Sequence, residues 1–131
     1  MQKKKFKEEV LGFLIEVSEL ADKTKNTDYR DEKMTSYNHV LLEIYIEGFH
    51  CILSIGNHLG INDKFLFYKY TTINNIQIES FLDVYGKAIH FNEEPSILNY
   101  IELFTLYLSL GSAFNFTQNE IEETYLEKYV Q

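Results

Sequence analysis

Apolar residues recur at three- and four-residue steps along most of this chain, the spacing that places side chains on one face of an α-helix. The pattern predicts helices over residues 3–25, from Thr35 or Ser36 to residue 59, over 76–90, from Pro95 to residue 114, and over 120–129. Gly60 is well placed to end the second helix, and Pro95 to open the fourth, because proline is favoured at a first helical position. The sequence therefore predicts an all-α bundle of four to five helices.

The segments between these helices carry weaker patterns. Residues 26–34 are polar and are expected to form a loop, whereas residues 62–75 are rich in aromatic side chains and are expected to form a connector that is helical in part. Thr117 and Glu120 have the spacing of a capping box, in which both side chains accept from free backbone amides. This box marks the start of the last helix.

A pattern within the second predicted helix recurs within the fourth. The second contains Tyr45-Ile46-Glu47-x-Phe49-x-x-x-Leu53-Ser54-Ile55-Gly56, and the fourth contains Tyr100-Ile101-Glu102-x-Phe104-x-x-x-Leu108-Ser109-Leu110-Gly111. Helices that share this pattern are expected to pack in equivalent ways, with the small Ser/Gly positions permitting close approach, so the sequence indicates internal duplication of a helix pair. Glu43 has no counterpart, because the matching position is Leu98.

Two pairs of glutamates interrupt the apolar stretches of the first two predicted helices. Glu16 and Glu19 are three residues apart, and Glu43 and Glu47 are four apart, so each pair shares one helical face. If the two helices pack antiparallel, the four carboxylates can meet and offer the oxygen ligands that Mg²⁺ prefers. The alternative is that these glutamates lie on solvated faces or pair with nearby lysines, namely Lys23, Lys25 and Lys33.

Composition indicates one globular domain over residues 1–131, with 45% hydrophobic residues and no tryptophan. The formal net charge of -8 disfavours binding to nucleic acid and to anionic membranes. The basic start of the chain runs into Glu8 and Glu9, unlike a signal peptide, and the long apolar stretches are broken by acids. With Cys51 as its one cysteine, the chain is predicted to be a soluble cytoplasmic protein.

Other kinds of catalytic chemistry find no support in the sequence. It contains no Gly-x-Ser-x-Gly, no P-loop and no dinucleotide-binding glycine pattern, and its histidines lack the spacing of a zinc site. His50 lies within one turn of Glu47 and is either a substrate contact or a packed histidine. Phe49 is either a base-stacking residue or part of the core, and Cys51 is interpreted as a small core residue.

The acid pairs and their surroundings resemble a known family. Glu16-x-x-Glu19 is followed by Leu42-Glu43-Ile44-Tyr45-Ile46-Glu47-Gly48-Phe49-His50, and the last predicted helix reads Phe116-Thr117-Gln118-Asn119-Glu120-Ile121-Glu122-Glu123-Thr124-Tyr125-Leu126-Glu127-Lys128. Together these stretches resemble the dimeric dUTP diphosphatases, all-α nucleotide pyrophosphohydrolases whose relatives include the MazG proteins. The hallmark of the family is an ExxE motif on one helix and an ExxD motif on the next, which together bind magnesium.

This resemblance implies a Mg²⁺-dependent diphosphatase that converts dUTP or a similar nucleoside triphosphate to the monophosphate and pyrophosphate, acting as a homodimer. The implied metal ligands are Glu16, Glu19, Glu43 and Glu47. The implied catalytic residues are Glu16, Glu19 and Glu47, and the candidate substrate contacts are Phe49 and His50.

The chain departs from the family pattern at three places. The family reads E-E-x-x-D, and here its second glutamate falls on Ile44 while Glu47 replaces the aspartate. A tryptophan-containing segment of the family falls on residues 27–30, which do not match it, and a phosphate-holding asparagine falls on Tyr129. These departures predict weakened activity. They also support a second hypothesis, in which an impaired relative acts as a nucleotide-binding or protein-interaction module.

Overall fold

The computed structural model of the chain describes residues 3–25, 35–61 and 78–130. These residues form five helices, which are α1 (Lys3–Lys25), α2 (Thr35–His58), α3 (Ile78–Glu93), α4 (Ile97–Ala113) and α5 (Gln118–Tyr129). No strand occurs in this part of the chain, so the predicted all-α fold is confirmed. The predicted loop at 26–34 and the predicted connector at 62–75 lie outside the described residues.

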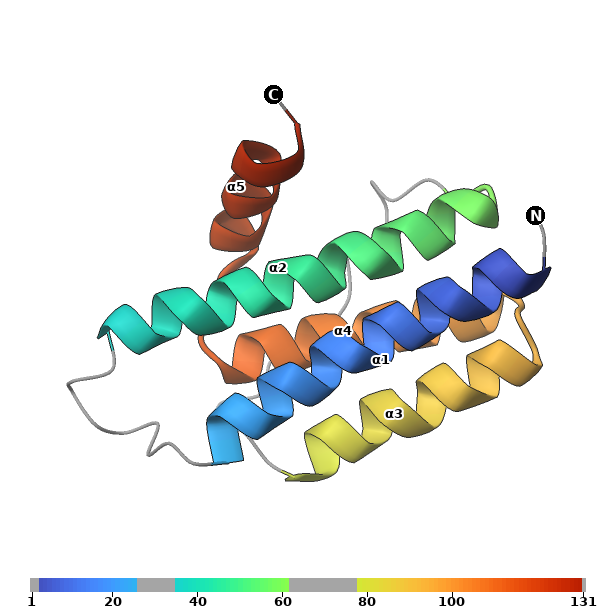
Figure 1. The fold of residues 1–131 in the computed structure, drawn as a ribbon, viewed down its shortest axis with the longest axis horizontal. Helices are drawn as coiled ribbons and strands as arrows, with labels where there is room; N and C mark the ends of the chain where they lie inside the picture. Colours follow the sequence, from blue (N-terminus) through green and yellow to red (C-terminus); the bar gives the residue numbers. More distant parts are fainter. Residues whose placement is uncertain (1–2, 26–34, 62–77, 131) are drawn as a thin grey trace.

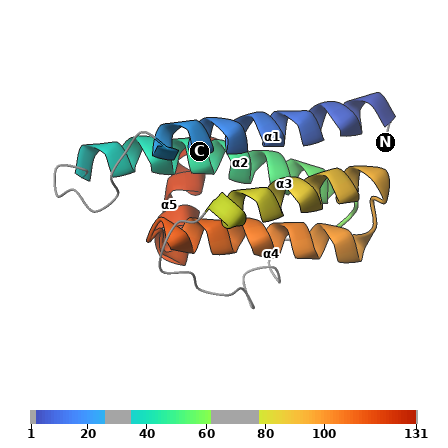
Figure 2. The ribbon, with the colours of Figure 1, turned by 90° about the horizontal axis from the view of Figure 1, so that it is seen from below.

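The first four helices form two antiparallel pairs. Figure 1 shows α1 and α2 running side by side in opposite directions, as predicted, and α3 and α4 doing the same. Figure 2 shows the pairs as two layers, with α1 above α3 and α2 toward α4. The last helix, α5, bends away from α4 by 105° and packs against α2. The core lies between the two layers.

The second and fourth helices end in the same motif. Gly60 has a φ of 74° after α2, and the amide of Ile61 donates to the Gly56 carbonyl at 3.0 Å. After α4, Asn115 has a φ of 67°, and the amide that follows it donates to the Gly111 carbonyl at 3.1 Å. Both ends are Schellman motifs, which need a residue in the left-handed region. The predicted stop at Gly60 is confirmed.

The starts of the last two helices show one correct and one wrong prediction. Ser96, not Pro95, marks the beginning of α4, because the Ser96 side chain caps the helix by accepting from the Asn99 amide at 3.1 Å. Pro95 therefore precedes the helix and is not its first residue. At α5, the capping box is confirmed, with N···O distances of 3.1 and 3.0 Å between Thr117 and Glu120.

The internal duplication is visible in a pair of equivalent hydrogen bonds between α2 and α4. The Tyr45 hydroxyl donates to the Tyr107 carbonyl at 2.8 Å, and the Tyr100 hydroxyl donates to the Ile52 carbonyl at 2.7 Å. In the aligned repeats Tyr45 matches Tyr100, and Ile52 matches Tyr107. Each bond is thus the copy of the other under exchange of the two helices. The predicted duplication of a helix pair is confirmed.

Glycines allow this contact to be close. The Tyr45 and Tyr107 rings stack with centroids 4.4 Å apart, and the Tyr107 hydroxyl donates to the Tyr45 carbonyl at 2.7 Å. A Cβ on Gly111 would lie 2.5 Å from the Tyr45 hydroxyl oxygen, and a Cβ on Gly48 would collide with the Tyr107 ring. Both positions require a residue without a side chain because a tyrosine ring fills the space.

The apolar character of α2 reflects its place in this core. Within the described residues, His39–His58 is long and apolar enough to cross a membrane, with a mean hydropathy of 1.3, but 56% of it is buried inside the bundle. The α4 and α5 helices reach that length only as a pair, and they are sharply bent. A mostly buried helix of this kind is common in the core of a globular bundle.

We expect Tyr45→Phe and Tyr100→Phe to destabilise the fold by similar amounts, about 1–2 kcal/mol each, because each removes one buried hydroxyl-to-carbonyl bond. Urea unfolding followed by circular dichroism measures the loss. Tyr125→Phe is the control, since its hydroxyl is half-buried and lies a long 3.4 Å from His50. An unchanged midpoint for either core variant would contradict the proposed equivalence.

Candidate functional site

The predicted acids line one cleft between α1 and α2. The cleft has a volume of about 330 Å³ and is lined by Glu16, Glu19, Lys23, Val40, Glu43, Ile44, Glu47 and Lys128. Thus the four glutamates singled out from the sequence all border the same space, together with a lysine from each of α1 and α5. A cleft with four carboxylates and two ammonium groups keeps an excess of negative charge at neutral pH.

The helix pattern explains why the acids meet there. Phe13, Val17 and Leu20 of α1 are fully buried toward the core. Glu16 and Glu19 lie on the flank of α1 that faces α2, because residues near the buried stripe but off its centre come to the seam between helices. At this level α2 carries Gly48, where an added Cβ would lie 3.5 Å from the Glu16 Cβ and would crowd the Tyr107 ring.

Glu16 is the cleft carboxylate whose pKa is raised by its surroundings. Burial raises the pKa of Glu16 above its ordinary value, the negative charges of Glu19 and Glu47 raise it further, and Lys128 lowers it. Carboxylates act on one another in this way only across short distances in partly desolvated surroundings. Three of the four predicted acids are therefore electrostatically coupled, and a cation would stabilise them.

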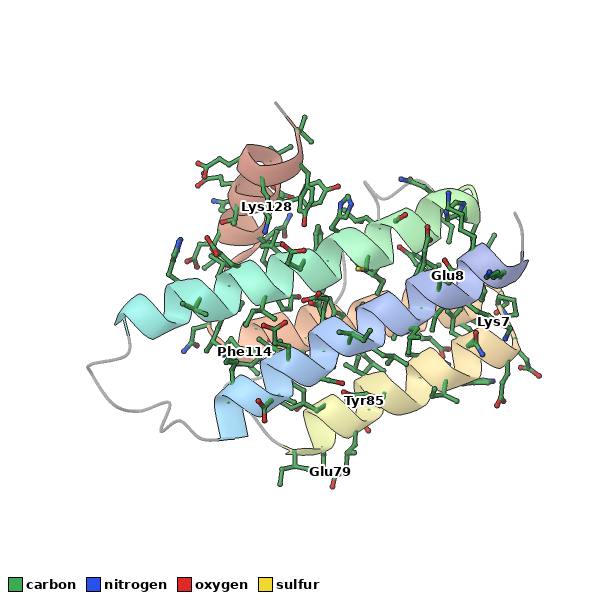
Figure 3. All side chains as sticks on the ribbon, viewed as in Figure 1. Lys7, Glu8, Glu79, Tyr85, Phe114 and Lys128 are labelled. Atoms are coloured by element: carbon green, nitrogen blue, oxygen red, sulfur yellow. The ribbon has the colours of Figure 1, made fainter. Side chains whose placement is uncertain are left out.

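Glu47 already has a cation beside it. The Lys128 ammonium group of α5 forms an ion pair with Glu47, and Figure 3 shows Lys128 on the part of α5 that lies over α2. This contact lowers the pKa of Glu47, and hydrogen bonding from Tyr129 lowers it further, against the opposing effect of burial. Burial and the nearby Glu47 charge raise the pKa of Tyr129 to about 12, so its hydroxyl keeps its proton.

Glu43 and Ile44 occupy the positions of the two adjacent glutamates in the family pattern, and Ile44 departs from it. The Glu43 side chain is 57% exposed and lies 3.3 Å from His39, one turn earlier on α2. Ile44 is buried but still contributes to the wall of the cleft. An acid at position 44 would thus face the same space as Glu16 and Glu47, whereas Glu43 stands at the outer rim.

The carboxylate groups of the cleft are the type of ligand that a hard divalent cation binds. Carboxylate oxygens are the ligands that Mg²⁺ uses, and the charges of Glu19 and Glu47 add to burial in raising the pKa of Glu16. In the described part of the chain, however, no three His, Cys, Asp or Glu side chains stand close enough to hold one metal ion. A divalent cation would therefore have to compete with Lys128 for Glu47.

The two candidate substrate contacts lie elsewhere. Phe49 is buried and packs against Phe104 and Tyr125, with ring centroids 5.8 and 5.6 Å apart. His50 stacks on the Tyr129 ring at 3.9 Å under α5. Neither residue lines the cleft. Phe49 packs in the core, as one of its two interpretations expected, and half-buried His50 packs on Tyr129, so its contact with a substrate stays a prediction.

Cys51 is not a reactive thiol. Burial raises its pKa to about 11, and the nearby Glu16 and Glu47 charges act in the same direction. This agrees with its interpretation as a small packed residue.

Sequence reasoning missed the contribution of α5. Lys128 and Tyr129 reach Glu47 across a large separation in the chain, and no local spacing pattern connects α5 with α2. The available signal was indirect: Tyr125 and Lys128 belong to the stretch that resembles the last helix of the family.

An all-α bundle with glutamates from two adjacent helices in one cleft fits the helical, dUTPase-like nucleotide hydrolases. The family model described as dUTPase matches residues 1–131, so the chain belongs to the dimeric, all-α dUTPase family, related to the MazG-like proteins. No curated protein and no solved structure gives a significant match to it.

We expect Glu16→Gln to stabilise the metal-free protein at pH 7, because it removes a carboxylate whose pKa is raised in the fold. A raised pKa means that the ionised form destabilises the fold at neutral pH, and that this effect disappears as the pH falls through the folded pKa. The gain should be under about 1 kcal/mol after solvent screening and should shrink toward pH 4.

Glu47→Gln should act in the opposite direction, since the pKa of Glu47 is lowered, and its stabilising effect is full above its ordinary pKa and is lost as the pH falls through the lowered folded pKa. Thermal unfolding in the presence of a chelator measures both effects, with the exposed Glu123→Gln as control. A loss of stability in Glu16→Gln at pH 7 would count against the repulsive cleft.

Proposed function

We propose that this protein is a Mg²⁺-dependent nucleoside triphosphate diphosphatase that converts dUTP or a similar nucleotide to the monophosphate and pyrophosphate. The observation that carries the proposal is the meeting of Glu16, Glu19, Glu43 and Glu47 in one cleft, within a chain that belongs to the dUTPase family. A nucleoside triphosphate brings several negative charges into an already negative cleft. Divalent cations among the carboxylates would offset this repulsion and favour binding of the triphosphate.

The residues divide the work by position. Glu16, Glu19 and Glu47 would hold the cation, and their side chains would have to draw closer together to do so. Bound Mg²⁺ would polarise the phosphate bridge and make a water molecule more acidic. Glu43, at the rim beside His39, would add charge at longer range. The apolar side chains of Val40 and Ile44 form the remaining wall and offer a surface for an uncharged part of the substrate.

The lysines would receive the polyphosphate. Lys23 and Lys128 border the cleft on two sides, and both groups carry a positive charge at neutral pH. Lys128 now pairs with Glu47, and a cation that takes over Glu47 would leave the lysine available to an anionic ligand. The exchange links metal binding to substrate binding because both need the Lys128–Glu47 pair to open.

The proposal is tested by assaying the purified chain against a panel of nucleoside triphosphates, including dUTP, with and without Mg²⁺. We expect Mg²⁺-dependent release of pyrophosphate and monophosphate. Glu16→Gln and Glu47→Gln should lower kcat/KM by about 100-fold or more, and Glu123→Gln should leave it unchanged. Absence of hydrolysis for every nucleotide would contradict the proposed activity.

Ile44→Glu should tighten Mg²⁺ binding by about tenfold or more and raise hydrolysis, because it places a further carboxylate on the cleft wall at the family's acidic position. Isothermal titration with Mg²⁺ measures the change. Ile101→Glu, on the exposed surface of α4, is the control. If Ile44→Glu bound Mg²⁺ no better than the parent and Glu43→Ala also changed nothing, the metal-site assignment would be wrong.

A second function is supported by a specific observation. The ion pair of Lys128 with Glu47 stands where a cation is needed, and Ile44 removes one ligand from the family's set. A protein in which this pair persisted would bind a nucleotide or a protein partner without turnover. Nucleotide binding that is independent of Mg²⁺ and is followed by no hydrolysis would favour this binding module over the diphosphatase.

We also propose that the protein acts as a homodimer. The described helices expose large apolar side chains on their outer faces, including Leu11 and Ile15 on α1 and Ile78 on α3. Exposed apolar surface of this kind is commonly covered by association.

A further inference from the structure

The outer face of α1 carries a stripe with coiled-coil spacing. Its members are separated alternately by four and three residues and are Lys4, Glu8, Leu11, Ile15, Ser18 and Asp22. All six are exposed, and the two central ones, Leu11 and Ile15, are 59% and 56% exposed. This spacing is the one by which a helix presents a continuous seam to a second helix. We call this set of six residues the α1 stripe.

Core packing does not explain the stripe, of which Ser18 contacts Tyr85 of α3. The core positions of α1, namely Phe6, Val10, Phe13, Val17 and Leu20, point the opposite way and are buried. Figure 2 shows α1 along the outer edge of the bundle, with its far side open. An amphipathic helix normally carries polar residues on this side, so two adjacent exposed aliphatic side chains at the centre of the seam need a partner.

The charges of the stripe make it complementary to itself when reversed. If a second α1 runs antiparallel and Leu11 faces the partner's Ile15, then Lys4 faces the partner's Asp22 at both ends. Beside the stripe, Lys5 and Glu19 occupy equivalent flanking positions, which come opposite one another in an antiparallel pair. A parallel arrangement would instead place Lys4 against Lys4 and Asp22 against Asp22, which is repulsive. The charge pattern therefore selects one orientation.

The backbone at the centre of the stripe allows close approach. Gly12 lies beside Leu11, and no atom comes within 4 Å of the Cβ position of Gly12, so this side of the helix is open. A shallow hollow of about 410 Å³ is lined by Lys4, Lys7, Glu8 and Leu11. These four residues have the spacing of the hole that receives one side chain of a facing helix in knobs-into-holes packing.

The neighbouring helix extends the apolar surface. Tyr85 of α3 contacts Ser18 of the stripe through its hydroxyl (Figure 3). Leu82 and Ile89, one turn to either side of Tyr85, are 54% and 49% exposed. A helix lying on the stripe would have apolar surface from α3 at its flank.

We propose that the α1 stripe is the interface between two copies of this chain, which pair through their first helices in antiparallel orientation. The inference deepens the homodimer part of the proposed function by naming its surface. The partner is a second copy of this chain, because two antiparallel stripes bring apolar residues together at the centre and opposite charges together at both ends. The interface also lies next to the acidic cleft, since Glu19 borders both.

Charge reversal tests the pairing directly. Sedimentation velocity over a concentration series of the full chain should show a dimer, and Lys4→Glu or Asp22→Lys alone should raise the dimer dissociation constant by about tenfold or more, because each dimer contains two such pairs. The double variant Lys4→Glu/Asp22→Lys should restore association close to that of the parent. Circular dichroism confirms that each variant is folded.

The apolar centre is tested separately. Leu11→Asp should raise the dissociation constant by about 100-fold or more, whereas Ile97→Lys, an equally exposed aliphatic position on α4, should have no effect. A dimer that is insensitive to Leu11→Asp, or whose double charge variant is as weak as the single ones, would overturn the α1 interface while leaving a homodimer intact. A monomeric parent would overturn both, and the nucleotide assay reports on the diphosphatase independently.

Discussion

The contact between α2 and α4 is the interaction on which the other features depend. Two equivalent tyrosine hydroxyls, from Tyr45 and Tyr100, each donate across the helix pair to a backbone carbonyl, and the stacked rings of Tyr45 and Tyr107 fill the space that Gly48 and Gly111 leave. Buried hydroxyl bonds of this kind are directional and fix the relative register of two helices. Because α1 packs on α2 and α5 also packs on α2, this register sets where the acids of α1 and the lysine of α5 come together.

The two copies of the repeat, in α2 and α4, differ at the surface but share their core contacts. Glu47 and its copy Glu102 both pair with a lysine, Lys128 and Lys87, although these lysines belong to unrelated helices. Only the first copy has an acid at position 43 and faces the acid pair of α1. The cleft thus forms where α2, the first copy of the repeat, packs against α1. In this cleft the pKa of Glu16 is raised, first by burial and then by the neighbouring charges of Glu19 and Glu47.

Local patterns were sufficient to predict much of this fold. Helix spacing predicted α1 and α2 closely, and the capping box at Thr117 was correct. The two acid pairs border one cleft, but among the described residues no three acidic side chains stand close enough to hold one metal ion, so their role as metal ligands stays a prediction. Two features were not predicted correctly: the first residue of α4, and an ion pair between residues far apart in the chain. Proline and serine compete for the start of α4, and the serine side chain prevailed because it satisfies a free amide. The Lys128–Glu47 pair joins residues far apart in the chain, so only the packing of α5 on α2 could disclose it.

The central claim is that the cleft holds negative charge which a divalent cation relieves. Thermal unfolding of the unmodified chain at pH 7 tests this claim most directly when MgCl₂ is compared with NaCl at equal ionic strength, because general screening is then the same in both series. We predict that Tm rises with MgCl₂ beyond the NaCl series, and that the difference shrinks toward pH 4, because the raised pKa of Glu16 makes this carboxylate lose its charge first. Superimposable MgCl₂ and NaCl series at pH 7 would contradict the claim.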